Sequence, residues 1–582
     1  MALGGRTVNK TFGMLRYGPT SAGNRWGIKA LPYVASHVKR IFPRADATSP
    51  GVVFFTDTPA VARDIEWVMQ RYPLEADPAT LAYLKQRADE GRRIEEAVHD
   101  ILSGYTPPDK WRDPAVRPRD YQLEADAIVH ATGRCLIADD LGLGKTFSAS
   151  LRLRDPEALP AAVVVPAQIP RQWQARIGEY LPWLRTHIVS RRDPYDPADK
   201  CGGRQPDVLI LSYAKFAEWG DYLAGQVQTV IFDEAQELRT GSGTTKYAAA
   251  CNVAWKARYR IELTATPVYN YGDEIWSLIN VIDPDFLGSR TEFKREWCGA
   301  DAGLARHAVV KDPAMLGGYL RDSGIMLVRT RKQTHRELPD PVQIEQVVDT
   351  DHAEIDQVAA DVAEHARLLV SGKGTFQDRG KAALDLDWRM RQATGVAKAP
   401  YVAEFCKLLL ETEKRIVLCG WHREVYSTWL AALAGYNPVL YTGSESPAQK
   451  QASVDKFLHG DARVLIMSLR SGAGLDGLQE NCSVMVFGEL DWSPMMHTQC
   501  LGRLNRDGQD STVVAYFMVS DDGTDPLMCD TLGIKRSQAI PLRDPDTPLF
   551  TQLTPENDRA RKLAAAVLRR VSRKGPAHAT RR

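Results

Sequence analysis

The stretch "IADDLGLGKT", Ile137–Thr146, joins a short apolar run to a glycine-rich turn, a lysine and a hydroxyl. Backbone N–H groups of such a turn at a helix N-terminus surround phosphate oxygens with donors, and the helix dipole adds to the attraction. Gly142 and Gly144 allow the tight turn, while Lys145 would reach the β- and γ-phosphates and Thr146 would hold Mg²⁺. The flanking "CLI" is strand-like and "FSASLRL" is helix-like. The stretch therefore predicts a nucleotide-binding site.

A pair of acids follows another apolar run, in "TVIFDEAQ" at Thr229–Gln236. Mg²⁺ prefers oxygen ligands, and the water that attacks the terminal phosphate has to be positioned. We expect Asp233 to hold the metal and Glu234 to polarise the attacking water. The acids lie at the end of a predicted buried strand, which favours this interpretation over an ordinary acidic turn.

Two further motifs carry groups suited to the same chemistry. In "LTATP", Thr264 and Thr266 would place hydroxyls near the phosphate cleft. In "QCLGRLNRDGQ" at Gln499–Gln509, Arg503 and Arg506 are three positions apart, which on a helix puts both on one face. Arginines supplied by a second domain would stabilise the charge that develops on the transferring phosphoryl group. A surface helix with incidental basic residues is the alternative reading of this spacing.

The fold class follows from two series of short β-branched runs that alternate with helical stretches. Continuous apolar runs bounded by turns are typical of strands buried on both faces of a parallel sheet. The first series is "AAVVVP", "VLILSY", "TVIFDEA" and "IELTATP", and the second is "RIVLCG", "VLIMSL", "VMVFGEL" and "VVAYFMV". We predict an α/β protein with two tandem, doubly wound lobes of parallel sheet, helical insertions, and a small α+β domain at the N-terminus.

The predicted boundaries follow from these changes of pattern. "GVVFFT" and the helical "AVARDIEWVMQRY" belong to the N-terminal unit, "SGKGTFQDRGK" at 371–381 is a predicted loop, and Arg559–Arg582 holds nine Lys or Arg and no acid. A frayed helix end is the alternative to a basic tail. The predicted parts are an accessory domain at 1–105, a first lobe at 106–330 with a helical protrusion at about 270–325, a helical linker at 331–395, a second lobe at 396–545 and a basic tail at 546–582.

Composition excludes several classes of protein. A chain of 582 residues is too long for one ordinary core. No apolar run approaches the roughly 20 residues that span a bilayer, and the first residues lack the apolar core of a signal peptide. The nine cysteines include no CxxC pair, which argues against a zinc site and favours a reducing cytoplasm. The net charge of +1 does not decide for or against nucleic acid.

Taken in order, the motifs resemble those of superfamily 2 helicases, and specifically the Swi/Snf-type DNA translocases. The matching stretches cover about 110–520: "RDYQLEADAI", "VVVPAQIPRQWQARI", "ILSYAKF", "LTATPVYNYGDEIWSLINVIDPDFLGSRTEFKREW", "IMLVRTRKQTHRELP", "SLRSGAGLDGLQ" and "ELDWSPMMHTQCLGRLNRDGQ". Asp139 stands where the strict phosphate-loop motif has glycine, a glycine that some helicase-type loops lack. Departures from the family pattern are Ala265, where glycine is usual, Gly502, which fits the wider superfamily better, and Asn505, where histidine is usual; around Asp476 the match slips. The second lobe resembles the annealing-helicase branch, and "NRWGIKALPYVASHVKRIF" is similar to the HARP module of that branch, with an unrelated small domain as the alternative.

The resemblance implies that the two tandem doubly wound lobes are RecA-like. The resemblance also implies an ATP hydrolase that uses Mg²⁺ and translocates on double-stranded DNA. It would remodel or reanneal DNA structures, such as forks or junctions, or DNA–protein complexes. We expect a cytoplasmic monomer with no membrane association. The residues implied to contact the nucleotide are Gln122, Asp140, Gly142, Leu143, Gly144, Lys145, Thr146 and Gln509. Those implied to contact nucleic acid are Pro166, Gln168, Ser212, Lys246, Ser468, Gly472 and Gly474.

Two other functions remain open from the sequence. One is a helicase that separates strands, which strand displacement on a tailed duplex would reveal. The other is an ATP-gated DNA-binding scaffold within a defence or phage system. The presence of Lys145, Asp233, Glu234 and Arg506 disfavours the scaffold, because all four residues serve hydrolysis in the predicted site.

Overall fold

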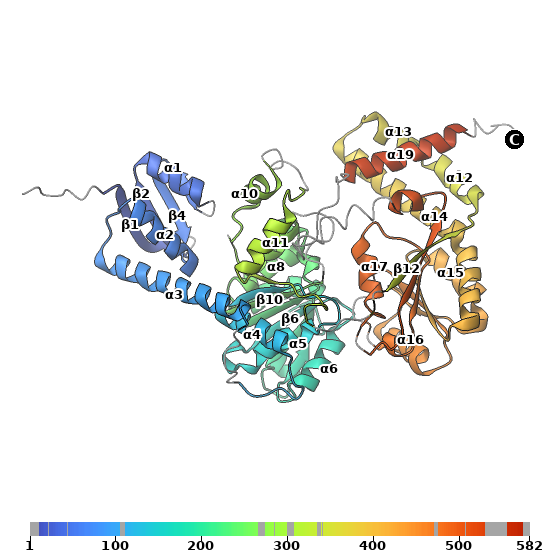
Figure 1. Cartoon of the computed structure of the whole chain (residues 1–582), viewed down its shortest axis with the longest axis horizontal. Helices are drawn as coiled ribbons and strands as arrows, with labels where there is room; N and C mark the ends of the chain where they lie inside the picture. Colours follow the sequence, from blue (N-terminus) through green and yellow to red (C-terminus); the bar gives the residue numbers. More distant parts are fainter. Residues whose placement is uncertain are drawn as a thin grey trace, which may run out of the picture. The chain divides into compact units, whose positions relative to one another are not determined.

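The computed structural model describes most of the chain, in three compact parts (Figure 1). The described residues are 11–20, 23–42, 45–104, 111–265, 274–284, 286–299, 308–334, 339, 341–470, 475, 477–506, 508–529 and 556–573. By their contacts, residues 1–139 and 144–328 form one unit, and residues 140–143 and 329–582 form another. We describe the first unit as an N-terminal domain followed by a first lobe, and the second unit as the second lobe.

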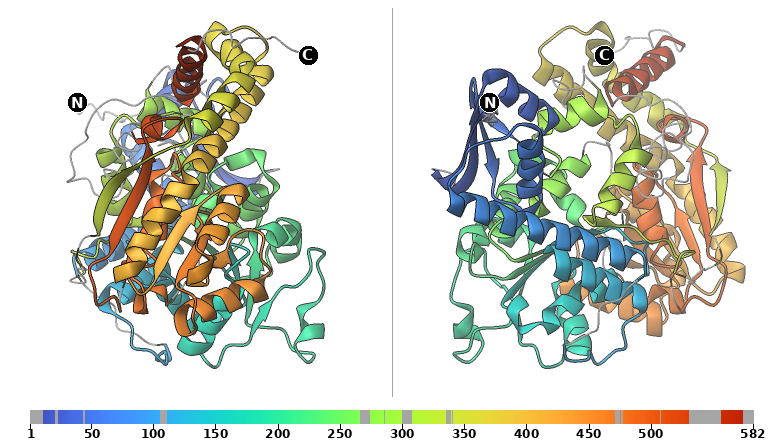
Figure 2. Two further views of the ribbon diagram at one scale, coloured as in Figure 1. Left: turned by 90° about the vertical axis from the view of Figure 1, so that its right-hand side faces the viewer. Right: turned by 60° about the vertical axis from the view of Figure 1, so that its left-hand side comes forward.

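The N-terminal domain is an antiparallel sheet with helices on one face. The strand order is β1-β2-β4-β3. Its elements are β1 Gly13–Thr20, β2 Gly23–Ala30, α1 Pro32–Ile41, β3 Asp46–Ser49, β4 Val52–Thr56, α2 Pro59–Arg71 and α3 Pro78–Leu102. Alternate strand residues, including Trp26 and Phe55, pack with side chains of all three helices in one core. The right-hand view of Figure 2 shows α1 and α2 on the same side of these strands.

Helix α3 connects this domain to the first lobe. Its C-terminal residues Val98 and Ile101 belong to the core of the first lobe, and α3 packs against α4. Lys39 of α1 also forms a 2.7 Å ion pair with Glu292 of α10. The N-terminal domain is therefore joined to the first lobe by packing as well as by the chain.

The first lobe is a seven-stranded parallel sheet in the order β11-β5-β10-β9-β6-β8-β7. Its strands are β5 Arg134–Ile137, β6 Ala161–Val165, β7 Thr186–Ile188, β8 Val208–Ser212, β9 Thr229–Asp233, β10 Tyr259–Leu263 and β11 Met326–Leu327. Its helices are α4 Asp120–Thr132, α5 Lys145–Leu151, α6 Pro170–Tyr180, α7 Tyr213–Leu223, α8 Thr245–Ala254, α9 Glu274–Ile282, α10 Arg290–Phe293 and α11 Pro313–Asp322. The two faces of the sheet pack into separate cores, so the central strands are buried on both sides as predicted.

The second lobe is a six-stranded parallel sheet in the order β12-β17-β16-β13-β15-β14. Its strands are β12 Val342–Val348, β13 Ile416–Gly420, β14 Val439–Tyr441, β15 Val464–Ser468, β16 Val484–Phe487 and β17 Val514–Ser520. Its helices are α12 His352–Asp361, α13 Ala363–Ser371, α14 Phe376–Thr412, α15 Arg423–Ala432, α16 Pro447–His459, α17 Pro494–Leu501 and α19 Glu556–Arg573. Both lobes thus have the predicted α/β architecture.

The region between the lobes differs from the predicted helical linker at 331–395. Residues 342–348 form β12, which pairs in parallel with β17 and belongs to the second sheet. Most of the predicted loop at 371–381 is also helical, because α14 begins at Phe376 after a capping box formed by Thr375 and Asp378. The 37-residue α14 then continues past the predicted boundary at residue 395.

The predicted basic tail contains a packed helix. In α19, the side chains of Leu563, Ala564 and Val567 are buried in a core shared with α12, α13 and α14. Figure 1 shows α19 beside α13. Residues 556–573 are therefore a structural part of the second lobe. None of the described helices is long and apolar enough to cross a membrane.

Candidate nucleotide-binding site

The phosphate-binding loop lies between β5 and α5, as the sequence predicts. Gly144 precedes α5 with a φ of 75°, a left-handed conformation that suits glycine. Lys145 begins the helix, and its Nζ donates a 2.7 Å hydrogen bond to the carbonyl oxygen of Asp139. The ammonium group therefore lies over the loop that would surround the phosphates, and Thr146 follows in the first turn of the helix.

Gln122 contacts the same loop from α4. Its side chain is 2% exposed, and its Oε1 accepts a 3.0 Å hydrogen bond from the backbone N–H of Arg119. A Cβ atom on Gly144 would lie 2.8 Å from Nε2 of Gln122. The left-handed backbone favours glycine at position 144, and any larger residue there would also have to displace the amide of Gln122. The structure brings Gln122 to the phosphate loop, in keeping with its predicted role.

Asp233 and Glu234 lie at the carboxyl end of β9. Oδ2 of Asp233 accepts a 2.7 Å hydrogen bond from the indole N–H of Trp173, and Oδ1 accepts a 3.0 Å bond from the backbone N–H of Glu234. Burial and the neighbouring Glu234 raise the pKa of Asp233 to about 6, although the bond from Trp173 and the charge of Lys145 act in the opposite direction. A positive ion beside this carboxylate would therefore relieve an unfavourable buried charge.

Glu234 has a strained backbone and a defined side-chain partner. Its φ is 52°, a left-handed value that is uncommon for residues other than glycine and recurs at active sites. Nε2 of Gln236 donates a 2.6 Å hydrogen bond to Oε2 of Glu234. The hydroxyl of Thr264 donates a 2.7 Å bond to Oε1 of Gln236. The amide of Gln236 thus connects the end of β10 to the predicted catalytic acid. Thr266 lies outside the described residues.

The first lobe offers suitable ligands for Mg²⁺. The hydroxyl of Thr146 and the buried carboxylate of Asp233 are hard oxygen donors, and Mg²⁺ is commonly held by one or two such side chains together with phosphates and water. Within the described parts of the chain, no group of three or more His, Cys, Asp or Glu side chains could hold a metal ion. The residues present therefore fit a magnesium ion that arrives with the nucleotide.

The tip of the phosphate loop, Asp140–Leu143, is fixed by the segment that follows β11. The backbone N–H of Arg331 donates a 3.0 Å hydrogen bond to Oδ2 of Asp140, and Nε of Arg331 donates a 2.9 Å bond to the carbonyl of Leu141. A Cβ on Gly142 would lie 2.8 Å from the guanidinium of Arg331. Sequence reasoning did not assign Arg331 to the site. Its position in the motif "VRTR" after an apolar strand was the available signal.

The second lobe places Arg503 and Arg506 together, but not on a helix. Helix α17 ends at Leu501, and both arginines lie in the turns that follow Gly502. The prediction that both arginines lie on one face of a helix is therefore wrong, because the helix ends at the glycine and the turn-forming residues after it. Nη1 of each arginine nevertheless lies near the same acceptor, the carbonyl of Leu475, at 3.4 Å for Arg503 and 3.5 Å for Arg506.

Gln509, a predicted nucleotide contact, is engaged within the second lobe. Its Nε2 donates hydrogen bonds to the carbonyls of Cys482 at 2.9 Å and Leu504 at 3.3 Å. These bonds fix the chain after the arginines. A contact of Gln509 with nucleotide stays a prediction.

Of the described residues predicted to contact nucleic acid, four end a strand or lie in the loop after one, and Lys246 lies on a helix. Pro166 and Gln168 follow β6, Ser212 ends β8, and Ser468 ends β15. Lys246 lies in the first turn of α8, where its Nζ forms a 2.7 Å ion pair with Glu237. Gly472 and Gly474, like Asp476, lie outside the described residues.

Comparisons with known proteins agree with this geometry. The model of the SNF2-related domain matches residues 63–393. The chain belongs to the SNF2-related family. The helicase conserved C-terminal domain matches residues 400–508 of this SNF2-related chain, which cover most of the second sheet. Together with ATP-dependent helicase relatives, these matches identify an ATP-hydrolysing, helicase-like enzyme.

Two relatives illustrate the range of this SNF2-related family. An uncharacterized ATP-dependent helicase, YqhH, of Bacillus subtilis is 26% identical over 446 residues, which are 70% of this chain and 76% of the relative. The DNA annealing helicase and endonuclease ZRANB3 of Mus musculus is 25% identical over 433 residues, which are 71% of this chain and 40% of that protein. This chain therefore matches less than half the length of ZRANB3. A solved SWI2/SNF2 ATPase core of Sulfolobus solfataricus in complex with double-stranded DNA is 19% identical, with a TM-score of 0.36, and covers 80% of this chain and 99% of that one.

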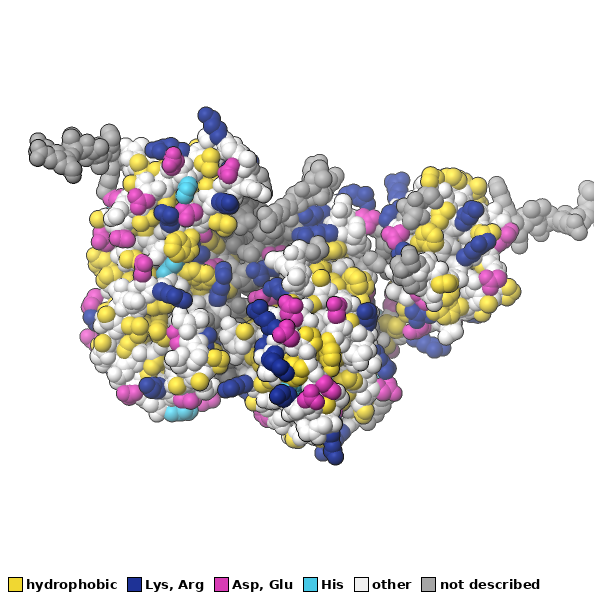
Figure 3. Space-filling view, turned by 180° about the vertical axis from the view of Figure 1, so that it is seen from behind, with side chains coloured by type: hydrophobic (Ala, Val, Ile, Leu, Met, Phe, Trp, Pro, Cys, Tyr) yellow, Lys and Arg dark blue, Asp and Glu magenta, His cyan; other side chains and the backbone are white. Residues whose placement is uncertain are grey.

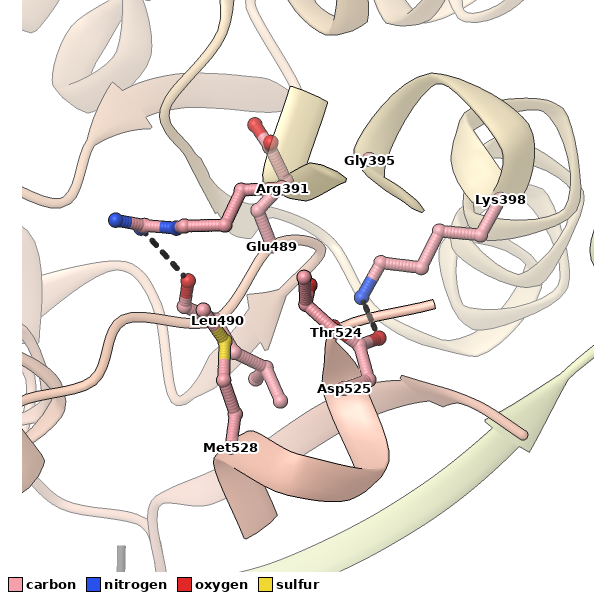
Figure 4. Close-up of a pocket in the computed structure, with 8 residues that line it drawn as sticks. All are labelled: Arg391, Gly395, Lys398, Glu489, Leu490, Thr524, Asp525 and Met528. Atoms are coloured by element: carbon pink, nitrogen blue, oxygen red, sulfur yellow. Dashed lines mark hydrogen bonds and ion pairs between the residues drawn. The ribbon is translucent and has the colours of Figure 1, made fainter. Parts of the chain in front are cut away.

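The second lobe of the SNF2-related chain also has a polar core behind its arginine-bearing motif. Figure 4 shows Lys398 of α14 paired with Asp525, and Arg391 bonded to the carbonyl of Leu490. Nζ of Lys398 lies 2.6 Å from Oδ2 of Asp525, and both side chains are nearly fully buried. Arg391 also pairs with Asp491 at 3.2 Å, at the start of the segment that leads into α17. The Arg391 pair fixes α14 against the segment that precedes Arg503, and the Lys398 pair fixes α14 against the segment that follows β17.

Proposed function

We propose that this chain is a DNA-dependent ATPase that translocates on double-stranded DNA and remodels or reanneals DNA structures or DNA–protein complexes. The observation that carries the proposal is the assembly at one edge of the first sheet. There the phosphate loop, the buried Asp233 and the Glu234–Gln236–Thr264 chain come together. Family membership supports the same chemistry, and the annealing activity in the name of ZRANB3 supports the proposed outcome on DNA.

In the proposed cycle, the loop amides and Lys145 bind the β- and γ-phosphates of ATP. Thr146 and Asp233 would hold Mg²⁺, which would supply positive charge against the phosphate oxygens. Glu234 orients the attacking water and is itself oriented by the amide of Gln236 at 2.6 Å. Arg503 and Arg506 stabilise charge in the transition state, a role in which one arginine is typically worth about 10³–10⁵ in rate.

DNA contacts are proposed at the strand ends of both lobes. Pro166, Gln168, Ser212 and Lys246 would contact phosphates from the first lobe, and Ser468 from the second. Phosphate contacts carry no base information, so binding should show little sequence preference and a steep dependence on salt. Cycles of closing around ATP and opening after hydrolysis would move such contacts along the duplex.

The finer features of the proposal concern substrate and context. The N-terminal domain would select forked or junction DNA, and DNA repair is the process that such a preference suits. We propose that the enzyme acts as a monomer in the cytoplasm, associated with the nucleoid.

The central experiment measures phosphate release against duplex, single-stranded and forked DNA. We expect stimulation by duplex and forked DNA, and loss of turnover in Lys145→Ala and Glu234→Gln. Lys200→Ala is a matched control, because Lys200 lies at the end of a surface turn in the same lobe. If DNA leaves the rate unchanged in active protein, the proposal is wrong.

The two alternatives have their own readouts. Strand displacement on a tailed duplex would identify a strand-separating helicase. An ATP-gated scaffold would bind DNA in an ATP-dependent manner with no stimulated phosphate release. The complete set of hydrolytic residues in the first lobe favours turnover over the scaffold.

A further inference from the structure

The N-terminal sheet has a second face that differs from its covered one. In β2, residues Trp26 and Ile28 point to the core and are fully buried, so Arg25, Gly27 and Lys29 lie on the opposite face. The side chains of all three helices of the domain join the core on the covered face. The other face, which we call the open face, is therefore presented to solvent among the described residues.

The centre of the open face is an aromatic ring lying on a glycine. Phe54 of β4 is the register partner of Gly27 in β2. A Cβ on Gly27 would lie 3.1 Å from Cε1 of Phe54, closer than an ordinary contact, so glycine leaves the room that the ring occupies. The ring of Phe54 therefore rests on the backbone of the neighbouring strand. This is a known way to stabilise a glycine within a sheet, and Phe54 remains partly exposed.

Basic side chains lie on the β1 and β2 side of this ring, whereas its register partner on the β3 side is Asp46. Arg16 of β1 is the partner of Gly27 on the other side of β2, and Arg25 and Lys29 flank Gly27 along the strand. Directly opposite and next-but-one positions on one face are about 5–8 Å apart. Arg16 and Lys29 are exposed, and no ion pair or hydrogen bond engages either side chain within the described residues.

Arg25 differs from these two residues, because it is held by an acid. Its Nη2 lies 2.5 Å from Oδ2 of Asp46 in β3. Arg16 and Lys29 therefore provide the unneutralised positive charge of the open face. Figure 3 shows basic and acidic side chains interspersed over the surface on view, and the whole chain has a net charge of only +1. The positive charge of Arg16 and Lys29 near Phe54 is thus a local feature and not a consequence of the overall charge.

We infer that the open face binds single-stranded DNA, with an unpaired base stacked on Phe54 and backbone phosphates paired with Arg16 and Lys29. Aromatic rings combined with basic side chains are the usual means of binding single strands without sequence preference. A duplex would offer phosphates to the two cations but no free base to the ring. The inference rests on the proposed function for the choice of DNA as the ligand, and it names the unpaired part of a fork as what the N-terminal domain recognises.

The test uses the full chain without nucleotide and a fluorescein-labelled oligothymidine, with binding followed by anisotropy. Stacking of one base corresponds to about 5- to 150-fold in affinity, so Phe54→Ala should weaken binding by a factor in this range. Phe54→Trp should keep it. The charge reversal Arg16→Glu with Lys29→Glu should weaken binding and reduce the slope of log affinity against log salt by about 1.4.

The charge-matched control is Lys85→Glu with Arg93→Glu, two exposed residues of α3 away from the sheet. It should leave oligothymidine binding nearly unchanged. Thermal unfolding of each variant checks that the domain remains folded. Photocrosslinking of an oligonucleotide containing 5-iododeoxyuridine gives an independent readout, and the crosslinked peptide should contain Phe54.

Several outcomes would overturn the inference. The inference is wrong if Phe54→Ala leaves oligothymidine binding unchanged and the crosslinks lie elsewhere. It is also wrong if the charge reversal weakens only duplex binding, because the two cations would then contact phosphates without any stacked base. Duplex-stimulated phosphate release separates this inference from the proposed function. If duplex stimulates turnover equally in wild type and Phe54→Ala while single-strand binding is also equal, the inference fails and the function stands. If DNA never stimulates turnover but the oligonucleotide crosslinks to Phe54, the proposed function fails and the inference stands.

Discussion

The hydroxyl of Thr264 donates a 2.7 Å hydrogen bond to the side-chain oxygen of Gln236. The other end of the same amide donates to Glu234 at 2.6 Å. Because an amide has one donor end and one acceptor end, the bond from Thr264 determines which end faces the acid. A residue directly after β10 thereby sets the orientation of the predicted catalytic carboxylate at the end of β9.

Replacement of Thr264 by valine should slow turnover without weakening ATP binding. Valine keeps the shape of threonine but leaves the buried oxygen of Gln236 without its donor. One such hydrogen bond is worth about 0.5–1.5 kcal/mol, which corresponds to a fall in kcat of about 2- to 10-fold. Steady-state phosphate release and ATP titration measure the two effects. The control is Thr229→Val, because the Thr229 hydroxyl bonds to the carbonyl of Ala158 in the same lobe. An unchanged kcat in Thr264→Val would contradict this role.

Trp173→Phe should reduce activity through Asp233. The substitution keeps an aromatic ring in the core but removes the N–H that lies 2.7 Å from Oδ2 of the acid. Loss of such a partner behind a metal ligand typically lowers metal affinity or activity about 10- to 100-fold. We expect a higher Mg²⁺ requirement for ATP hydrolysis, measured by titrating Mg²⁺ at saturating ATP.

The same substitution at another buried tryptophan provides the comparison. Trp219 of α7 is fully buried and donates to the carbonyl of Arg191. Trp219→Phe should lower stability without changing the Mg²⁺ requirement. If both variants respond alike, the effect of Trp173→Phe reflects packing and not the bond to Asp233.

Arg331→Ala should weaken ATP binding. Nε of Arg331 donates to the carbonyl of Leu141 in the tip of the phosphate loop, and alanine removes this bond while it keeps the backbone N–H that donates to Asp140. Loss of the side-chain bond loosens the part of the loop that would contact phosphates. Hydrogen bonds of charged groups are worth about 1.5–3 kcal/mol, which corresponds to about 10- to 150-fold in affinity. Arg331→Lys should recover only part of this, since lysine lacks the planar fork of donors.

Isothermal titration with a non-hydrolysable ATP analogue measures this effect. Lys332→Ala removes the adjacent, exposed cation and should bind the analogue like wild type. Equal affinities for wild type and Arg331→Ala would show that the loop does not depend on this residue.

The parts of the fold that sequence predicts are those with buried, continuous patterns. The central strands β6, β8 and β9 are buried along nearly their whole length, so apolar runs reveal them. The edge strand β12 has largely exposed side chains, "VQIEQVV", and pairs on one side only, so it lacks this signal. Helix α19 was obscured because its basic exposed face dominates the composition, although Leu563 and Val567 are spaced for burial.

The candidate site likewise has residues that the sequence reveals and contacts that it does not. Lys145 and Asp233 meet because both follow parallel strands of one sheet, and the carboxyl ends of such strands share an edge. Trp173 is 60 residues from the acid it contacts, and a sequence gives no direction for its indole N–H. The contact of Arg331 with the loop likewise depends on β11 returning beside β5. Such contacts are set by tertiary structure and leave only weak traces in a single sequence.

Asp522→Asn should loosen the docking of α19 on the second lobe. Oδ2 of Asp522 lies 2.6 Å from Nδ1 of His352, and Oδ1 accepts a hydrogen bond from Arg570 of α19, which also bonds to Asp356 of α12. Asparagine removes the negative charge from this cluster. The cluster is partly exposed and screened by water, so we expect a loss of about 1 kcal/mol in the free energy of unfolding. Urea unfolding measures the loss, and limited proteolysis should release α19 sooner.

The dependence on pH distinguishes loss of charge from loss of packing. Burial favours a raised pKa for Asp522, but the hydrogen bonds from Arg570 and His352 outweigh it and hold the pKa at about 2. Because this value lies below the usual aspartate pKa of about 3.9, the stabilisation is fully present above the usual value. It is lost as the pH falls through about 2. The stability difference between wild type and Asp522→Asn should therefore be constant near neutral pH and shrink below pH of about 4. Asp361→Asn, an exposed position at the end of α12, should show no such difference at any pH. A difference for Asp522→Asn that persists undiminished in acid would show that the carboxylate charge does not hold α19.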